Sequence, residues 1–309
     1  MGIVVLGAVF VDIKGFPDDV YIPDGRNAGK VEYIHGGVSR NVVEDIANME
    51  LRPTFLSIVD ESALGDAVVR KLNNHKVNTE YIQSAPNGMG TWLAVFDNNG
   101  DLAGSISQRP DLMPLLDVLA KKGDEIFANA DSIIIEVDVD KEIVKKVVEL
   151  CEKHQKKLYG VVSNMSIAVE RRDFLQKFDC FICNQLEAGM FFADDFSETA
   201  PKELAEILAK KLQLAKIPSM VVTMGGAGSV YADMKGKKGF CPAKKVQVKD
   251  TTGAGDYFAA GFLYGLTCGY SLEKCGKIGS ILSGSIIRVI GAEMPAEWWE
   301  DIKTRISEL

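Results

Sequence analysis

The sequence predicts an α/β protein with a three-layer core, in which helices cover both faces of a mostly parallel sheet. Two observations lead to this prediction. Short apolar, strand-like runs alternate with helical stretches along most of the 309 residues, and this alternation is typical of βαβ units. Two segments, at about 14–35 and 88–108, instead have strand character without intervening helices. We interpret them as a small β-sheet lid on a single domain that spans residues 1–309.

The composition is typical of a folded, soluble globular protein. Hydrophobic residues make up 47% of the chain and charged residues 25%, as in ordinary globular proteins. The net charge is −8, and the short basic stretch at 235–238 is typical of a solvated turn and not of a nucleic-acid-binding patch, which argues against a nucleic-acid partner. Its apolar runs are too short to span a membrane. The first residues resemble a strand more than a signal peptide, so we expect a cytoplasmic location.

The core elements follow one another in chain order. We expect strands at 2–8, 54–59, 132–137, 158–162, 179–183 and 219–224, and helices at 39–49, 62–74, 140–156 and 201–216. In the second lid segment, Asp97-Asn98-Asn99-Gly100 separates two apolar runs, which predicts a β-hairpin.

We expect no disulfide, zinc site or redox site among the cysteines. Cys180 and Cys183 form a lone CxxC motif in a predicted strand. Their odd spacing places the two side chains on opposite faces of that strand. We therefore expect buried thiols.

A glycine-rich stretch, DTTGAGDYFAAG at 250–261, marks the candidate active site. Val246 and Val248 before it alternate with polar residues, which predicts a strand, and the apolar run 257–266 after it predicts a buried helix. The first backbone N–H groups of a helix lack partners and carry partial positive charge. Glycines let a phosphate approach them closely. A carboxylate at Asp256 beside such a site has a chemical purpose if it accepts a proton from an attacking hydroxyl.

This stretch resembles the C-terminal signature of the ribokinase-like PfkB family of carbohydrate and nucleoside kinases. The resemblance implies a ribokinase-like fold, ATP as the phosphoryl donor and Mg²⁺ as a cofactor. It implies that Asp256 is the catalytic base and that Gly253, Ala254 and Gly255 form an anion hole. It also implies a monovalent cation such as K⁺ beside the Asp250 loop in many members. Tyr257 departs from the family, which usually has a smaller residue there.

Other segments resemble further family signatures. Gly36-Gly37-Val38-Ser39-Arg40-Asn41 is similar to the N-terminal GG…N motif, which implies that Gly36, Gly37 and Asn41 contact the acceptor substrate. Asp12, after the first strand, would bind an acceptor hydroxyl, although Phe10 replaces the usual Asn. Asn184-Gln185-Leu186-Glu187 resembles the NxxE motif, which implies an ATP contact at Asn184 and Mg²⁺ held by Glu187 through water. The TMGGAG stretch resembles the nucleotide-side turn and implies ATP contacts at Thr223, Gly225 and Gly228.

The acceptor is the least determined part of the prediction. Residues 27–41 and 90–107 resemble pseudouridine kinases, whereas 163–166 and Gln108-Arg109 depart from them. Our best hypothesis is a pseudouridine kinase, with a ribokinase- or fructokinase-like sugar kinase as the alternative. A non-catalytic nucleotide or sugar sensor on the same fold stays open. A dinucleotide-dependent oxidoreductase is disfavoured, because TMGGAG does not complete a G-x-G-x-x-G fingerprint. Apolar lid residues, namely Trp92, Leu93 and Val95, suggest a homodimer through the lid.

Overall fold

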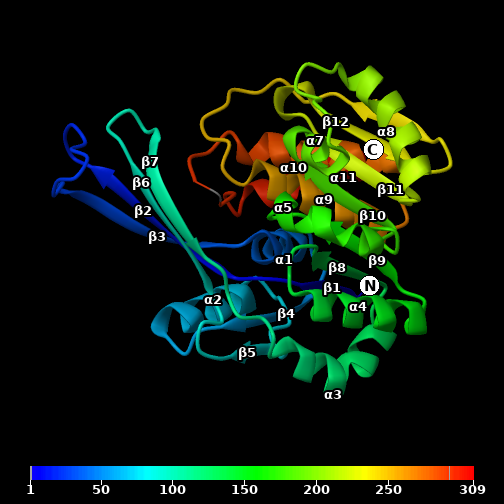
Figure 1. Ribbon diagram of the computed structural model, residues 1–309, viewed down its shortest axis with the longest axis horizontal. Coiled ribbons are helices and arrows are strands. Elements are labelled where there is room, and N and C mark those ends of the chain that lie inside the picture. The colour runs from blue at the N-terminus through cyan, green and yellow to red at the C-terminus, as the bar shows by residue number, and fades with distance from the viewer. Residues whose placement is uncertain (1, 292) are drawn as a thin grey trace.

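The computed structural model describes residues 2–291 and 293–309. Its larger sheet has nine strands, and most of them are parallel (Figure 1). The strands from β11 to β5 pair in parallel, and β12 and β13 add an antiparallel edge. The order is β13 (Lys238–Cys241), β12 (Ser229–Asp233), β11 (Ser219–Thr223), β10 (Cys180–Asn184), β9 (Lys157–Val161), β8 (Ser132–Glu136), β1 (Ile3–Leu6), β4 (Thr54–Val59) and β5 (Ile82–Ser84).

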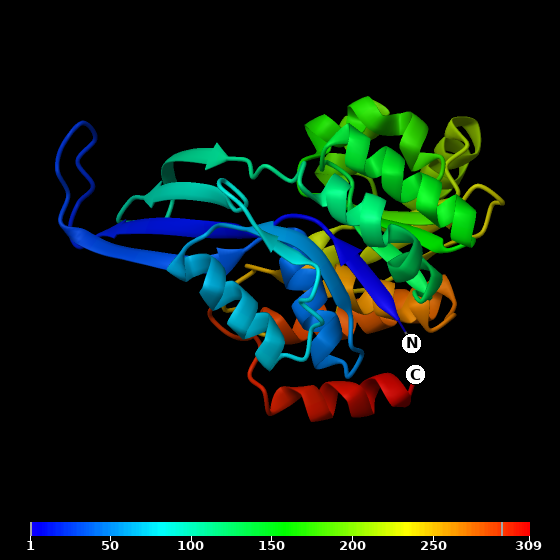
Figure 2. The same ribbon diagram turned by 90° about the horizontal axis from the view of Figure 1, so that it is seen from below.

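Helices cover both faces of this sheet and create two separate apolar cores (Figure 2). On one face lie α3 (Leu115–Ala128), α4 (Lys141–His154), α5 (Met165–Ala168), α6 (Arg172–Leu175), α7 (Gln185–Phe192) and α8 (Pro201–Ala215). On the other face lie α1 (Val38–Asn48), α2 (Ala63–Asn74), α9 (Ala254–Thr267), α10 (Leu272–Ile286) and α11 (Trp298–Ser307). Short 3-10 turns occupy Val169–Arg171 and Gly225–Ala227.

Successive residues of the central strands enter opposite cores, as the two-residue period of a strand requires. In β8, Ile133 and Ile135 join one core and Ile134 joins the other. The same alternation separates Cys183 from Cys180 in β10, and both are buried free thiols. The three-layer α/β prediction is therefore confirmed, and so are the burial of Cys180 and Cys183 and their placement on opposite faces of the strand.

The lid is a separate four-stranded sheet that projects away from the helices of the core (Figures 1 and 2). Its strand order is β3 (Gly29–Gly36), β2 (Phe10–Pro17), β6 (Gly90–Phe96) and β7 (Leu102–Gln108). The β6–β7 hairpin forms at the predicted turn, where Gly100 has a φ of 86°. The first lid segment begins earlier than predicted and contains a loop at 18–28.

Two local predictions were wrong. Residues 242–249 form no strand, although Val246 and Val248 alternate with polar residues, and the side chain of Val248 is exposed. The segment follows the edge strand β13 and has no neighbour with which to build a ladder. Asp12 follows the first strand, as expected, but it belongs to the lid strand β2, which begins earlier than the predicted lid segment. Within the described residues, every helix is too short or too polar to cross a bilayer.

The closest approach of α9 and α10 supplies a stability test. A Cβ atom added to Gly261 of α9 would lie 3.0 Å from Gly279 Cα and 3.1 Å from Ile278 O of α10. We expect Gly261→Ala to lower the free energy of unfolding by about 1–3 kcal/mol, because the two helices must separate. Gly284→Ala on α10 is the matched control, since no atom lies within 4 Å of the added methyl. It should raise the free energy of unfolding by up to about 1 kcal/mol, as measured by urea denaturation.

Candidate active site

The glycine-rich loop ends at the start of α9, where the backbone turns sharply. Gly253 is the N-cap residue and has a φ of 77°, which favours glycine. Asp250 holds the loop in place: one carboxylate oxygen accepts hydrogen bonds from Thr252 N (2.9 Å) and Oγ1 (2.8 Å), and the other accepts one from Gly291 N (2.9 Å). Burial alone would raise the pKa of Asp250, but these hydrogen bonds hold it below its usual value.

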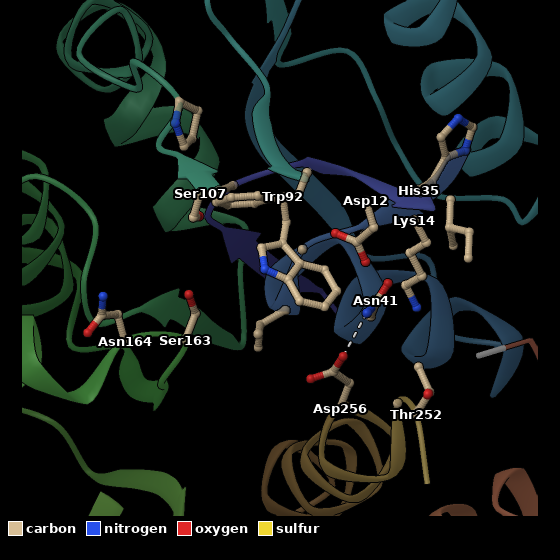
Figure 3. A pocket seen from close by; sticks show the side chains of 18 of the residues that line it. Asp12, Lys14, His35, Asn41, Trp92, Ser107, Ser163, Asn164, Thr252 and Asp256 are labelled. Atoms are coloured by element: carbon tan, nitrogen blue, oxygen red, sulfur yellow. Dashed lines mark hydrogen bonds between the residues drawn. The ribbon is translucent and has the colours of Figure 1, made fainter. Parts of the chain in front are cut away.

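Asp256 lies in the first turn of α9 and faces a residue far away in the sequence. Its Oδ2 accepts a hydrogen bond from Asn41 Nδ2 of α1 at 2.6 Å (Figure 3). Burial raises the pKa of Asp256 to about 6, and the charge of Asp12 adds to this rise. The Asn41 hydrogen bond and the charge of Arg40 oppose it. A carboxylate with such a pKa is suited to accept a proton near neutral pH.

The predicted acceptor residues gather opposite Asp256. The Asp12 side chain reaches from β2 toward the same space (Figure 3), and burial raises its pKa. A Cβ atom at Gly36 would lie 2.9 Å from both carboxylate oxygens of Asp12, and one at Gly37 would lie 2.6 Å from Ala8 O. Gly37 also has a φ of 101°. The two glycines are therefore needed so that the backbone between lid and core can pass beside Asp12.

These residues line one cavity of about 850 Å³ beneath the lid. The cavity brings together Asp12, Gly36, Gly37, Asn41, Gly253 and Asp256 from the predicted site. Ala254 and Gly255 are not part of the lining, and the amide of Ala254 donates to Thr251 O at 3.2 Å. Aromatic side chains from the lid strands, namely Phe10, Phe16, Trp92 and Phe96, complete one wall.

The opposite wall contains charged residues that the sequence analysis did not select. Glu136, at the end of β8, accepts a hydrogen bond from Ala8 N at 3.1 Å, and burial followed by the charge of Asp138 raises its pKa. The Asp138 carboxylate accepts hydrogen bonds from Ser163 N (3.0 Å) and Oγ (3.3 Å). Arg109 donates to the backbone carbonyl of Asp138. An acidic residue directly after the buried run Ile133–Ile135 was a signal that could have identified Glu136.

A second cavity, of about 1000 Å³, lies at the ends of β10 and β11. It is lined by Asn184, Thr223 and Gly225, three of the four residues predicted to contact ATP. Two aspartates, Asp194 and Asp195, and apolar side chains also line this cavity; the apolar ones include Leu186, Met190 and Phe196. The carboxyl ends of parallel strands are the usual place for a ligand in an open α/β sheet.

Gly228 and Glu187 lie outside both linings. Gly228 has a φ of 108°, and any Cβ atom there would overlap the carbonyl oxygen of Cys241. This glycine is therefore required by the turn between β11 and β12. Asn184 and Glu187 form a capping box at the start of α7: Asn184 Oδ1 accepts from Glu187 N at 2.8 Å, and Glu187 Oε2 accepts from Asn184 N at 2.7 Å. Burial raises the pKa of Glu187.

The two departures from the family pattern have different structural consequences. Tyr257 is buried away from the cavity, where its hydroxyl accepts a hydrogen bond from Met294 N at 3.1 Å and its ring stacks on Trp299. It therefore does not crowd the base. Phe10 lines the cavity, and its ring packs so closely on Gly90 that a side chain there would collide with it.

Comparison with known proteins agrees with this geometry. A model of the pfkB family of carbohydrate kinases matches residues 2–299. A guanosine-inosine kinase from Exiguobacterium acetylicum is 33% identical over 287 residues, which cover 92% of this chain and 94% of the relative. A pseudouridine kinase from Escherichia coli is 24% identical and covers 84% of this chain and 82% of its own.

Solved structures show the same fold. Arabidopsis thaliana ribokinase complexed with ribose and ATP superposes with a TM-score of 0.84 at 20% identity, covering 97% of this chain and 98% of that one. Adenosine kinase from Sinorhizobium meliloti gives 0.75 at 22% identity and covers 99% and 98%. The chain belongs to the pfkB family of carbohydrate kinases and is an ATP-dependent phosphotransferase that acts on a hydroxyl group of a sugar or nucleoside.

Proposed function

We propose that the acceptor is a nucleoside and that the phosphoryl group goes to its ribose hydroxyl. The observation that carries this proposal is the lining of the first cavity, which combines the polar side chains of Asp12, Asn41 and Asp256 with the aromatic rings of Phe10 and Trp92. The polar side chains suit a ribose, and the aromatic rings suit a nucleobase, which binds by stacking. The 33% identical guanosine-inosine kinase supports the same class of acceptor.

The base of the nucleoside has two candidates. Guanosine or inosine is favoured by the relative that aligns over 92% of this chain. Pseudouridine is favoured by the likeness of residues 27–41 and 90–107 to pseudouridine kinases, and by the 24% identical pseudouridine kinase. The first candidate has the stronger support, because its similarity is higher and extends over more of the chain.

In the proposed mechanism, Asp256 accepts the proton of the acceptor hydroxyl as its oxygen attacks the γ-phosphorus of ATP, and ADP leaves. One oxygen of Asp256 is held by Asn41, so the other oxygen is available to the hydroxyl. The backbone at Gly253, Ala254 and Gly255 would stabilise negative charge on the transferring group. ATP would occupy the second cavity, beside Asn184, Thr223 and Gly225 and next to the Gly228 turn.

Two cations complete the proposal. Mg²⁺ neutralises phosphate charge during such transfers. Glu187 would hold it through water, since carboxylate oxygen suits this ion and Glu187 Oε2 is fixed by Asn184 N. A monovalent cation such as K⁺ would bind backbone carbonyl groups of the loop that Asp250 folds.

An acceptor screen tests the proposed substrate class. We expect ADP formation with guanosine, inosine or pseudouridine to exceed that with ribose or fructose, and to need Mg²⁺.

Trp92→Ala should raise KM for the nucleoside about tenfold, as loss of base stacking costs about 1–3 kcal/mol, while KM for ribose changes less. Faster turnover of ribose or fructose than of any nucleoside would show a sugar kinase. ATP binding without turnover of any acceptor would favour a sensor. Omitting K⁺ from the assay tests the monovalent cation.

The proposed base gives a prediction for pH and mutation. Asp256 must be deprotonated to accept a proton, so kcat/KM should fall as the pH drops below about 6. Asp256→Asn keeps the shape of the side chain but removes the base, and should lower kcat by roughly 10²–10⁴. Asp117→Asn, on an exposed position of α3, is the control and should leave kcat unchanged. Wild-type turnover by Asp256→Asn would disprove the assignment.

We also infer that two copies of the chain pair through the lid. One row of residues crosses the lid from strand to strand and contains Tyr33, Ile13, Leu93 and Ile106. Tyr33, Leu93 and Ile106 are exposed. Trp92, which we expected to be exposed with Leu93, belongs to the opposite face and lines the cavity. An apolar row on the outer face of a small sheet favours burial against a partner.

Sedimentation equilibrium checks this pairing. We expect a dimer for the unmodified chain and a monomer for Leu93→Asp/Ile106→Asp, because two charges would have to be buried in the interface. Ser105→Asp, on the opposite face of the same strand pair, should leave the dimer intact. A monomer at micromolar concentration of the unmodified chain would contradict the inference.

A further inference from the structure

Arg40 is a buried cation behind the proposed catalytic base. Only 6% of the residue is exposed, and its guanidinium makes three contacts. Nη1 donates to His35 O at 3.2 Å and to Asn41 Oδ1, and Nη2 donates to a carboxylate oxygen of Glu44. His35 precedes the two acceptor glycines, and Asn41 holds Asp256. The Arg40 guanidinium therefore contacts both the backbone just before the two glycines and the side chain that holds Asp256.

The charge of Arg40 is balanced on the side away from the cavity. Glu44 is buried one helical turn after Arg40 on α1, and its other oxygen lies 3.4 Å from Lys71 Nζ of α2. The same ammonium lies 3.2 Å from Glu293. His75 Nε2 lies 3.6 Å from Glu44, and its Nδ1 is bonded to Asn48. Glu44, His75 and Glu293 resemble a metal-ligand group, but Lys71 already supplies the positive charge there.

The contact between Arg40 and Asn41 determines which way the Asn41 amide points. A guanidinium only donates hydrogen bonds, so the group that faces it must be the amide oxygen. The NH₂ group of Asn41 then faces Asp256, and its nitrogen lies 2.6 Å from Oδ2 of that carboxylate. With the amide reversed, its oxygen would face a carboxylate and its NH₂ group a cation, and both contacts would be repulsive.

We propose that Arg40 is a positioning residue, which fixes the Asn41 amide so that one oxygen of Asp256 is held and the other stays free for the acceptor hydroxyl. The inference rests on the proposed role of Asp256 as the base. It goes further in assigning a task to a residue that touches neither substrate. If the ion pair between Arg40 and Glu44 contributed only to folding, a folded Arg40→Lys variant, which keeps the charge, would also keep the wild-type kcat.

The charges around Asp256 predict how its pKa responds when Arg40 is removed. Asp12 of β2 raises the pKa of Asp256, whereas Arg40 and the Asn41 hydrogen bond lower it. Asp45 of α1 interacts electrostatically with Asp256 and has a pKa far above its usual value because it is buried. Removal of the Arg40 charge should therefore raise the pKa of Asp256, by about one unit for a nearby charge. The acidic limb of the pH profile should move upward by the same amount.

The test uses a direct titration and a kinetic one on the full chain. Aspartate labelled with ¹³C at the carboxyl group, with Asp256→Asn for assignment, reports the titration of Asp256 by NMR without any acceptor. We expect Arg40→Met to raise that midpoint by about one unit. Arg40→Lys keeps the charge but cannot make the three contacts together, so its midpoint should stay near that of the wild type. Its kcat should fall about tenfold or more, because the Asn41 amide is no longer fixed.

Three controls make the outcomes distinct. Arg70→Met, on an exposed position of α2, should change neither the NMR midpoint nor kcat. Arg40→Met/Glu44→Gln also removes the buried carboxylate that has lost its guanidinium partner, and provides a second variant if Arg40→Met does not fold. Wild-type kcat in a folded Arg40→Lys variant would overturn the proposal, and so would an unchanged Asp256 midpoint with wild-type kcat in a folded Arg40→Met or double variant. If Asp256→Asn kept full activity, the base assignment would fail, and the NMR titration would still decide whether Arg40 controls Asp256.

Discussion

The hydrogen bond from Asn41 to Asp256 joins two parts of the chain that are 215 residues apart in sequence. Asn41 lies in α1, which follows the lid, and Asp256 lies in α9, which follows the glycine-rich loop. Both helices pack on the same face of the large sheet and share one apolar core. The site therefore exists only when the sheet is complete, because its strand order determines where these two helices lie.

The remaining polar groups are arranged around this bond. Asp12 comes from the lid, Arg40 lies behind Asn41, and the loop held by Asp250 sets the first turn of α9. The lid also contributes the aromatic wall of the cavity. A single hydrogen bond between two helices thus links the part of the protein proposed to bind the acceptor with the part proposed to perform the chemistry. Burial at this junction shifts the pKa of Asp256 to about 6.

Local sequence patterns predicted the parallel core, the lid hairpin and the loop before α9, because these features depend on period, turn residues and glycine. They did not predict what depends on contacts between distant segments. Val248 has the alternation of a strand but no neighbouring strand. Gly228 belongs to a stretch that resembles a nucleotide-binding turn, yet glycine is required there because a side chain would overlap the carbonyl oxygen of Cys241. Glu136, Asp138 and Arg109 enter the cavity through folding of the core and lid together. Asn184 and Glu187 were identified as a motif whose spacing also suits helix capping, and the structure shows that they do cap α7.

The strand β2 has two tasks on its two faces. Asp12, Lys14 and Phe16 line the cavity, while Ile13 on the opposite face is half-buried and packs against the apolar core that contains α1 and α9. An insertion or deletion of one residue before Asp12 would exchange these faces. The acid would then face that apolar core, and an isoleucine would occupy the ligand-binding space. Evolution can change individual side chains along β2, but it cannot change the length of the preceding segment without losing both surfaces at once.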